Sequence, residues 1–224
     1  PALLSADDKR FFELIRQWDL QNNVKSAAAT VFQVWVDSLK TKIWYDELTQ
    51  QDSVVYAWPY DNTLADALTR DSAFTFIDDI RTPAKETIYD VFVASLKAAT
   101  PVLLQKEKDG KLEWAANKNT TVYHILKDAV LPFARNGLSI GGGKHIINAT
   151  QHSHGPSWRM IVELTNETDA YVVYPGGQSG NPGSKYYDQF IDTWAAGNYY
   201  KAWVMKKGDD KHPKVKWTMT FKKA

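Results

Sequence analysis

Residues 158–164 read Trp-Arg-Met-Ile-Val-Glu-Leu, a short apolar run that predicts a strand. Near the C-terminal end, Val215, Trp217, Met219 and Phe221 alternate with polar residues, as in a half-buried strand. We predict strands at residues 146–150, 158–165, 169–174 and 214–222. These strands are expected to form one mainly antiparallel sheet, with a helix at residues 184–196 packed against it.

Before residue 136 the apolar residues recur at helical spacing. Four helices are predicted: one from Ser5, one over residues 24–48, one from Thr82–Pro83 to Leu103, and one after Thr120 that ends at Pro132. Ser5 and Asp8 have the spacing of a capping box at the start of the first helix. Proline is favoured at the first helical position, which predicts the start at Thr82–Pro83.

The predicted fold class is therefore α+β, with a helical region at residues 1–135 and a β-rich region at residues 136–224. Glycines at positions 137 and 141–143 predict a flexible loop at the start of the second region. No linker rich in proline, glycine or serine separates the two regions physically.

The composition is ordinary for a globular protein, with 44% hydrophobic and 24% charged residues and a net charge of +1. Lysines cluster near the C-terminus, but Asp209 and Asp210 interrupt them. Phosphate binding needs a larger clustered excess of positive charge, so no nucleic-acid partner is expected. The absence of cysteine excludes disulfides and thiol catalysis, and no apolar run is long enough for membrane insertion.

Three local patterns resemble known sites but lack essential members. The run Gly141–Lys144 has neither the glycine spacing nor the Ser or Thr of a phosphate-binding loop. Ser179 lies in Gly-Gln-Ser-Gly-Asn, where a nucleophile elbow needs a final glycine, so Ser179 is interpreted as a turn residue. His152 and His154 have the spacing to chelate a metal on a strand, but no further ligand is convincing. We predict no metal or cofactor site in this chain.

Two longer motifs are more specific. Residues 154–159 read His-Gly-Pro-Ser-Trp-Arg, and residues 175–184 read Pro-Gly-Gly-Gln-Ser-Gly-Asn-Pro-Gly-Ser. Together with Leu-Glu-Trp-Ala-Ala-Asn at residues 112–117 and Gly-Leu-Ser-Ile-Gly-Gly at residues 137–142, they resemble, in order and spacing, the end of the β chain in the penicillin acylase family. The resemblance is strong over residues 110–200 and looser in the helical region.

This resemblance implies the fold and chemistry of an N-terminal-nucleophile hydrolase. Members of the family have a four-layer αββα sandwich, and a self-cleaving precursor exposes a serine that attacks an acyl amide. The implied substrate is a penicillin, an acyl-homoserine lactone or a similar acyl amide. Family members are usually exported, often to the periplasm, and calcium, where present, is held by residues upstream of the matching region.

The sequence departs from the family at its first residue, because Pro1 has no hydroxyl group. The nucleophile and the oxyanion-hole residues of the family fall upstream of the matching region. We therefore assign no catalytic residue here and expect a C-terminal fragment that is inactive alone. Its expected partners are the remaining α and β segments of the precursor, or a second copy through self-association. The alternative is a free-standing binding or scaffold domain derived from the same fold.

Three residues are candidates for a supporting role in the complete enzyme. Arg159 and Glu163 share one face of the predicted strand at residues 158–165, and buried charges must be paired or functional. Salt bridges to helices, or exposure to solvent, would explain the same pattern without function. His154, in the His-Gly-Pro-Ser-Trp-Arg motif, is the third candidate.

Overall fold

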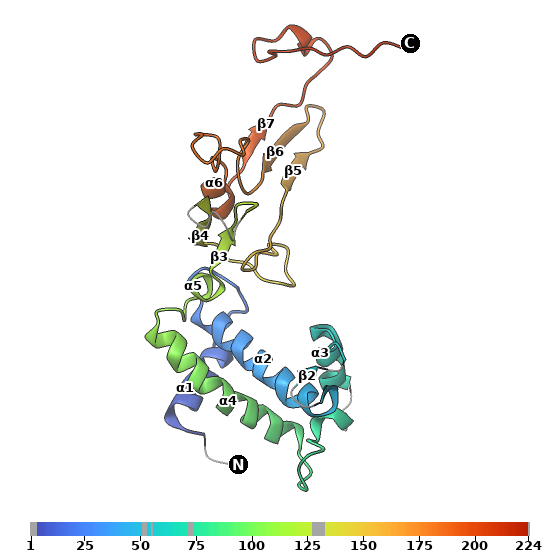
Figure 1. Cartoon of the computed structure of the whole chain (residues 1–224). Helices are drawn as coiled ribbons and strands as arrows, with labels where there is room; N and C mark the ends of the chain where they lie inside the picture. Colours follow the sequence, from blue (N-terminus) through green and yellow to red (C-terminus); the bar gives the residue numbers. More distant parts are fainter. Residues whose placement is uncertain (1–3, 51–52, 55, 71–73, 127–132, 224) are drawn as a thin grey trace.

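The computed structural model describes residues 4–50, 53–54, 56–70, 74–126 and 133–223. The longer helices form one end of the elongated molecule, two of the small sheets lie in the middle, and the C-terminal residues extend away from the other end (Figure 1). The predicted α+β class is confirmed, because the described elements are helices and antiparallel strands. The αββα sandwich stays a prediction, and so does the division at residues 135 and 136.

The first two helices are the ones that local sequence signals predict. Helix α1 (Ala6–Arg16) begins at a capping box, in which Asp8 N donates to Ser5 Oγ at 3.1 Å and Ser5 N donates to Asp8 Oδ2 at 2.8 Å. Helix α2 (Ala27–Leu48) begins after Ser26, whose Oγ accepts a hydrogen bond from Ala29 N. The helix predicted at residues 24–48 is therefore confirmed over most of its length.

The predicted helix start at Thr82–Pro83 is wrong, because helix α4 (Ile88–Lys108) begins five residues later. Thr87 and Asp90 form a second capping box and fix the first turn, while Thr82 Oγ1 donates to Glu86 Oε1 at 2.9 Å. The predicted end at Leu103 falls within the helix, which includes Pro101 and continues to Lys108.

The helices pack around two clusters of buried residues. Phe11, Val31, Ala99 and Leu103 join α1, α2 and α4. The second cluster joins α2 and α4 to helix α3 (Asp61–Arg70) and the 3-10 turn η1 (Thr75–Ile77), and its members include Leu39, Ile43, Trp44 and Leu64. A two-residue hairpin of β1 (Thr49–Gln50) and β2 (Ser53–Val54) follows α2.

A strand replaces the start of the helix predicted after Thr120. Helix α5 (Trp114–Lys118) ends at Asn119, which has a left-handed backbone with φ of 47°. Strand β3 (Thr120–Val122) then pairs antiparallel with β4 (Arg135–Leu138). Both buried threonines of β3 bond to a neighbouring segment, since Thr120 Oγ1 donates to Gln151 O and Thr121 N donates to His152 O. The rest of that prediction extends into residues 127–132, outside the described residues.

The largest sheet has three antiparallel strands in the order β5 (Arg159–Glu163), β6 (Asp169–Val173) and β7 (Tyr200–Ala202). The strands predicted at residues 158–165 and 169–174 are thus confirmed. The expected common antiparallel sheet is confirmed for these two strands, which pair as β5 and β6. It is wrong for residues 146–150 and 214–222, which pair with no described strand. Leu138, Ile140, Val173, Ile191 and Trp194 form the buried core beside β4 and β6.

Three other predicted elements of the β-rich region differ from the structure. Residues 146–150 form turns instead of a strand, because Asn148 and Thr150 bond to the loop at residues 141–143. The helix predicted at residues 184–196 is reduced to α6 (Ile191–Ala195), since Ser184 O accepts from Tyr187 N in a turn. Residues 214–222 pair with no described strand, and Trp217 is 93% exposed.

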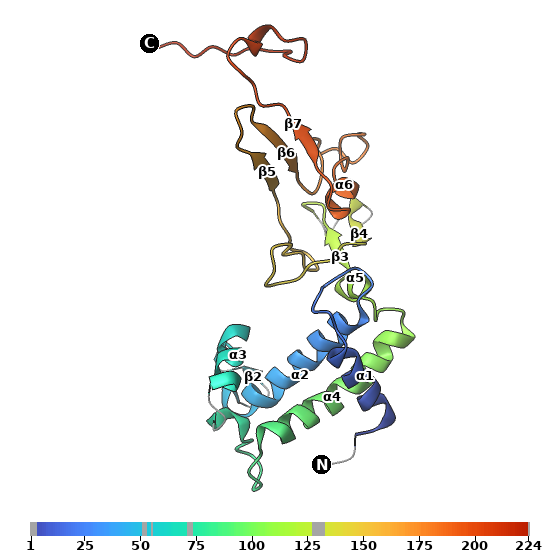
Figure 2. The same cartoon turned by 180° about the vertical axis from the view of Figure 1, so that it is seen from behind.

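The C-terminal residues after β7 carry only a short 3-10 turn, η3 (Asp209–Lys211). Figure 2, the view from behind, shows the same separation of this tail from the helical end. No helix within the described ranges combines the length and the apolar character that a membrane span requires.

Candidate functional site

The glycine loop, residues 141–143, lies where the helical and β-rich parts of the chain meet. Gly142 O accepts a hydrogen bond from Trp114 Nε1 at 2.6 Å, and Gly142 N donates to Asn22 O at 2.9 Å. Gly143 N donates to Asn148 O at 3.0 Å. The main chain of the predicted flexible loop is therefore fixed from both sides.

Only glycine fits at the centre of this loop. Gly142 has φ of +88°, and a Cβ atom there would lie 2.1 Å from Asn148 O. Both the backbone conformation and the close approach exclude a side chain. The glycines predicted from the sequence thus serve close packing of main chain against main chain.

Lys118, at the end of α5, supports the loop from its buried side. Its Nζ donates to Gly141 O at 2.7 Å, to Thr150 Oγ1 at 2.8 Å and to Gly142 O at 3.4 Å. No carboxylate within the described ranges forms an ion pair with this ammonium group. Burial therefore lowers the pKa of Lys118 to about 8, because a charged group without a counter-charge is disfavoured away from water.

Arg159, at the start of β5, supports the same loop indirectly. Its Nη2 donates to Asn148 Oδ1 at 2.7 Å and its Nη1 to Trp194 O at 2.7 Å. The guanidinium carbon lies 4.8 Å from the centre of the Trp194 ring, within the range of a cation–π interaction. Burial lowers the pKa of Arg159 from its ordinary value.

The structure does not bring Arg159, Glu163 and His154 together. Glu163 is exposed at the opposite end of β5, where it pairs across the sheet with Asp169. His154 is exposed, and its Nδ1 lies 3.1 Å from the hydroxyl oxygen of the adjacent Ser153. The supporting roles of all three residues stay predictions, but only Arg159 makes hydrogen bonds to two other parts of the chain.

The other candidate residues have structural partners. His152 Nδ1 donates to Asn119 O at 2.8 Å, and its Nε2 lies 2.9 Å from the hydroxyl of Tyr123. Ser179 Oγ accepts from Asn181 N at 3.1 Å, which confirms its interpretation as a turn residue. Where the structure describes the chain, no group of three His, Cys, Asp or Glu side chains is placed to hold a metal ion.

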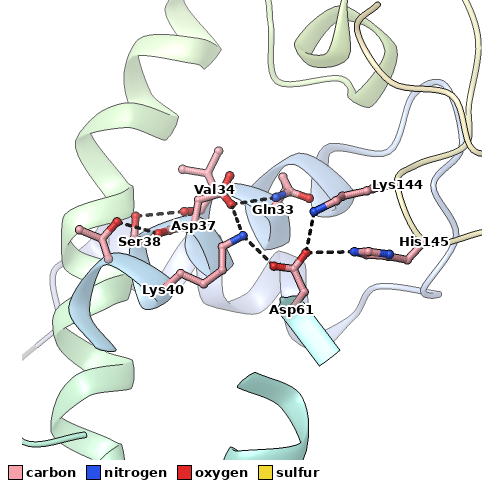
Figure 3. A network of polar contacts seen from close by, with 9 residues as sticks. Gln33, Val34, Asp37, Ser38, Lys40, Asp61, Lys144 and His145 are labelled. Carbon is pink, nitrogen blue, oxygen red and sulfur yellow. Dashed lines mark hydrogen bonds and ion pairs between the residues drawn. The ribbon is translucent and has the colours of Figure 1, made fainter. Parts of the chain in front are cut away.

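A polar cluster connects the residues after the glycine loop to the helical end (Figure 3). Asp61, at the start of α3, accepts from Lys40 Nζ of α2 at 2.9 Å. Its other carboxylate oxygen lies 3.0 Å from His145 Nε2 and 3.5 Å from Lys144 Nζ. The hydrogen bond from Lys40 is the main cause that lowers the pKa of Asp61 to about 2.

Sequence reasoning missed Lys118 and Asp61, although it singled out Arg159. One signal for Lys118 was present: it lies four residues after Trp114, so both side chains project from one face of α5 toward the loop. Within the described residues these groups fix a loop. The threonine among them, Thr150, accepts from Lys118 Nζ and donates its hydroxyl proton to Gly141 O, so it is held as part of the loop and not paired as a nucleophile with a base. The arrangement can position main chain precisely, but it shows no bond-breaking centre.

Comparison with known proteins assigns the chain to a family. A family model described as penicillin amidase matches residues 2–210. The chain is 25% identical to the acyl-homoserine lactone acylase QuiP of Pseudomonas aeruginosa, over 84% of this chain and 26% of that protein. It is 26% identical to QuiP of Pseudomonas syringae pv. tomato, over 93% of this chain and 28% of that protein.

The chain therefore spans about a quarter of the length of the curated relatives that it matches. The family match extends through α1, the glycine loop and the three-stranded sheet, so it includes every element of the junction described above. The chain belongs to the penicillin amidase family.

Proposed function

We propose that this chain is the C-terminal part of an acyl amide hydrolase whose substrates are acyl-homoserine lactones or related acyl amides. In that reaction water is added across the amide C–N bond, which yields a carboxylic acid and a free amine. The family match over residues 2–210, with relatives named as acyl-homoserine lactone acylases, carries the proposal. We propose further that the chain does not catalyse this reaction by itself.

The site geometry supports a positioning role instead of a catalytic one. Amide hydrolysis by a side chain requires a nucleophile, a base and an oxyanion hole in one place. The described residues offer Ser153 beside His154, but both are exposed neighbours in sequence. Lys118 and Arg159 instead hold the glycine loop, and we propose that the loop in turn supports the active site of the complete enzyme.

The exposed surface of β5 supports the proposal that the rest of the enzyme packs on this sheet. Trp158 is 53% exposed just before the strand, and Met160 and Ile161 are 56% and 52% exposed although they project to opposite faces. Strand β5 is also an edge strand, so its outer main-chain groups are available for pairing. The proposed partners are the remaining α and β segments, with self-association when these are absent. Export, and calcium bound through upstream residues, stay predictions of the family resemblance.

The test compares the complete natural gene product that contains this chain with the 224-residue chain alone. Both are incubated with octanoyl-homoserine lactone, a penicillin and a phenylacetyl amide, and the released amine is measured by mass spectrometry. We expect turnover by the complete enzyme and none by the chain alone. Turnover by the isolated chain, abolished by a substitution within it, would overturn the positioning role. Failure of the complete product on every acyl amide would refute the proposed activity and favour a binding or scaffold domain.

A further inference from the structure

A hollow of about 520 Å³ lies beside the glycine loop. Residues 20–24, which connect α1 to α2, form one wall. The rest of the lining includes Ile140, Asn148, Arg159 and residues 195–197 at the end of α6 and after it. The hollow therefore has contributions from both parts of the chain, and all of its lining residues lie in the described ranges.

The positive charge of Arg159, which lines this hollow, has no counter-charge within the described residues. A guanidinium group has five N–H donors, and the described contacts of Arg159 use one from each of its terminal nitrogens. Both acceptors are neutral, and no carboxylate of the described chain forms an ion pair with Arg159. Lys118, which bonds to the two lining residues Gly141 and Gly142, also has no such counter-ion. A partly buried cation without a counter-charge favours binding of an anion.

The rest of the lining is mixed: Gln21, Asn22 and Asn23 are polar, whereas Leu20 and Ile146 are apolar and exposed. Leu20, Val24, Ile140 and Ile146 line the hollow. Leu20 is 79% exposed and has φ of 63°, a left-handed conformation that is sterically unfavourable for leucine. Strained residues of this kind are concentrated at functional sites. The strained residue Leu20 thus adds an apolar side chain to the lining of a hollow that also contains Arg159, a cation without a counter-charge within the described residues.

We infer that this hollow binds a monocarboxylate with an apolar tail, with the carboxylate on Arg159 and the tail against Leu20 and its apolar neighbours. A planar guanidinium matches the two oxygens of a carboxylate better than a single-point cation does. A fatty acid has this combination of one charge and one apolar chain. That such an acid is the acyl product of the enzyme rests on the proposed function, whereas the binding itself does not.

Calorimetry on the purified 224-residue chain tests the site without any requirement for turnover. Octanoate is compared with butyrate, which has the same charge and a shorter tail, and with octanamide, which has the same tail and no charge. We expect affinity to rise by about two- to fourfold per methylene from butyrate to octanoate. Octanamide should bind at least about tenfold more weakly than octanoate, because it lacks the charge-assisted hydrogen bonds to Arg159.

Two substitutions examine the two halves of the site separately. Arg159→Gln should weaken octanoate binding at least about tenfold, whereas Arg10→Gln, at an exposed arginine paired with Glu107, should leave it unchanged. Leu20→Gly should weaken octanoate binding but not butyrate binding. Glycine accepts the left-handed backbone readily, so this second variant is expected to fold at least as well as the natural chain.

Equal binding of octanoate and octanamide, or no binding of octanoate, would overturn the inference. Unchanged octanoate binding in a folded Arg159→Gln variant would also overturn it. If the Arg159→Gln variant is not folded, as the absence of a cooperative unfolding transition would show, two other measurements decide the question. These are octanoate binding by the Leu20→Gly variant and the comparison of octanoate with octanamide on the natural chain. Octanoate binding with no acylase activity in the complete enzyme would refute the proposed function alone, and activity without octanoate binding would refute this site alone.

Discussion

Replacing Lys118 with methionine should remove a pH dependence of stability that the buried ammonium group imposes. Methionine has a similar length and no charge. The carbonyl acceptors of Lys118 keep other partners in the variant, because Gly142 O still accepts from Trp114 Nε1 and Gly141 O from Thr150 Oγ1. The substitution therefore removes the charge without leaving an obvious unpaired carbonyl group.

The magnitude follows from the lowered pKa. In the folded protein the pKa of Lys118 is about 8, against an ordinary value of 10.5 that applies to the unfolded chain. Between these two pH values the unfolded chain binds more protons, so the free energy of unfolding rises with pH. Each pKa unit corresponds to about 1.4 kcal/mol, so the natural chain should gain on the order of 3 kcal/mol relative to Lys118→Met. The gain is complete above pH 10.5 and is lost as the pH falls through about 8.

Urea unfolding followed by circular dichroism, at several pH values between 7 and 10.5, measures this difference. Tyrosines and exposed lysines also titrate in part of this range, but they are common to both proteins and cancel in the comparison. A difference in the free energy of unfolding that stays constant from pH 7 to 10.5 would refute the reasoning. It would mean that the ammonium group is hydrated or has a counter-charge in solution.

Three further predictions concern other parts of the molecule. Gly142→Ala should lower the free energy of unfolding by roughly 3 kcal/mol in urea titrations, because Cβ would meet Asn148 O and the backbone has a positive φ; an unchanged midpoint would contradict this. Asp61→Asn should cost about 1–2 kcal/mol at pH 7 after allowance for solvent screening. That cost should be fully present above pH 3.8 and vanish as the pH falls through about 2; a cost that persists in acid would contradict the ionic origin. Ile161→Thr, at an exposed position of β5, should reduce self-association in light scattering while changing stability by less than about 0.5 kcal/mol; an unchanged mass distribution would contradict it.

Local signals predicted the parts of the fold that depend on neighbouring residues. The capping box of Ser5 and Asp8 requires only four consecutive residues, and the structure contains it. The helix start at Thr82–Pro83 was also a local prediction. In the structure the side chains of Thr87 and Asp90 each accept a hydrogen bond from the other residue's main-chain N–H, and this capping box fixes the start there. Two adequate start signals lie within six residues of each other, and the sequence does not rank them.

Strands were harder to predict, because a strand exists only when another strand pairs with it. Residues 214–222 have the alternation of a half-buried strand, but in the described chain Trp217 and Phe221 are 93% and 87% exposed. The alternation indicates that one face of the segment is suited to burial, but it does not identify the strand with which the segment would pair. The contacts of Lys118 could not be predicted for the same reason. Its acceptors lie in residues 141–150, which are distant in sequence and contact α5 only in the folded chain.

The glycine loop also constrains the order in which the protein assembles during synthesis. Its hydrogen-bond partners come from residue 22, from Trp114 and from Asn148, so the junction closes only after the ribosome has passed residue 150. The helices can pack earlier, because the buried residues of their two clusters all lie before residue 108. Contacts between residues distant in sequence form slowly, since the intervening chain must first be ordered. Within this chain, the segment at residues 20–24 is therefore synthesised well before the residues of the loop that bond to it.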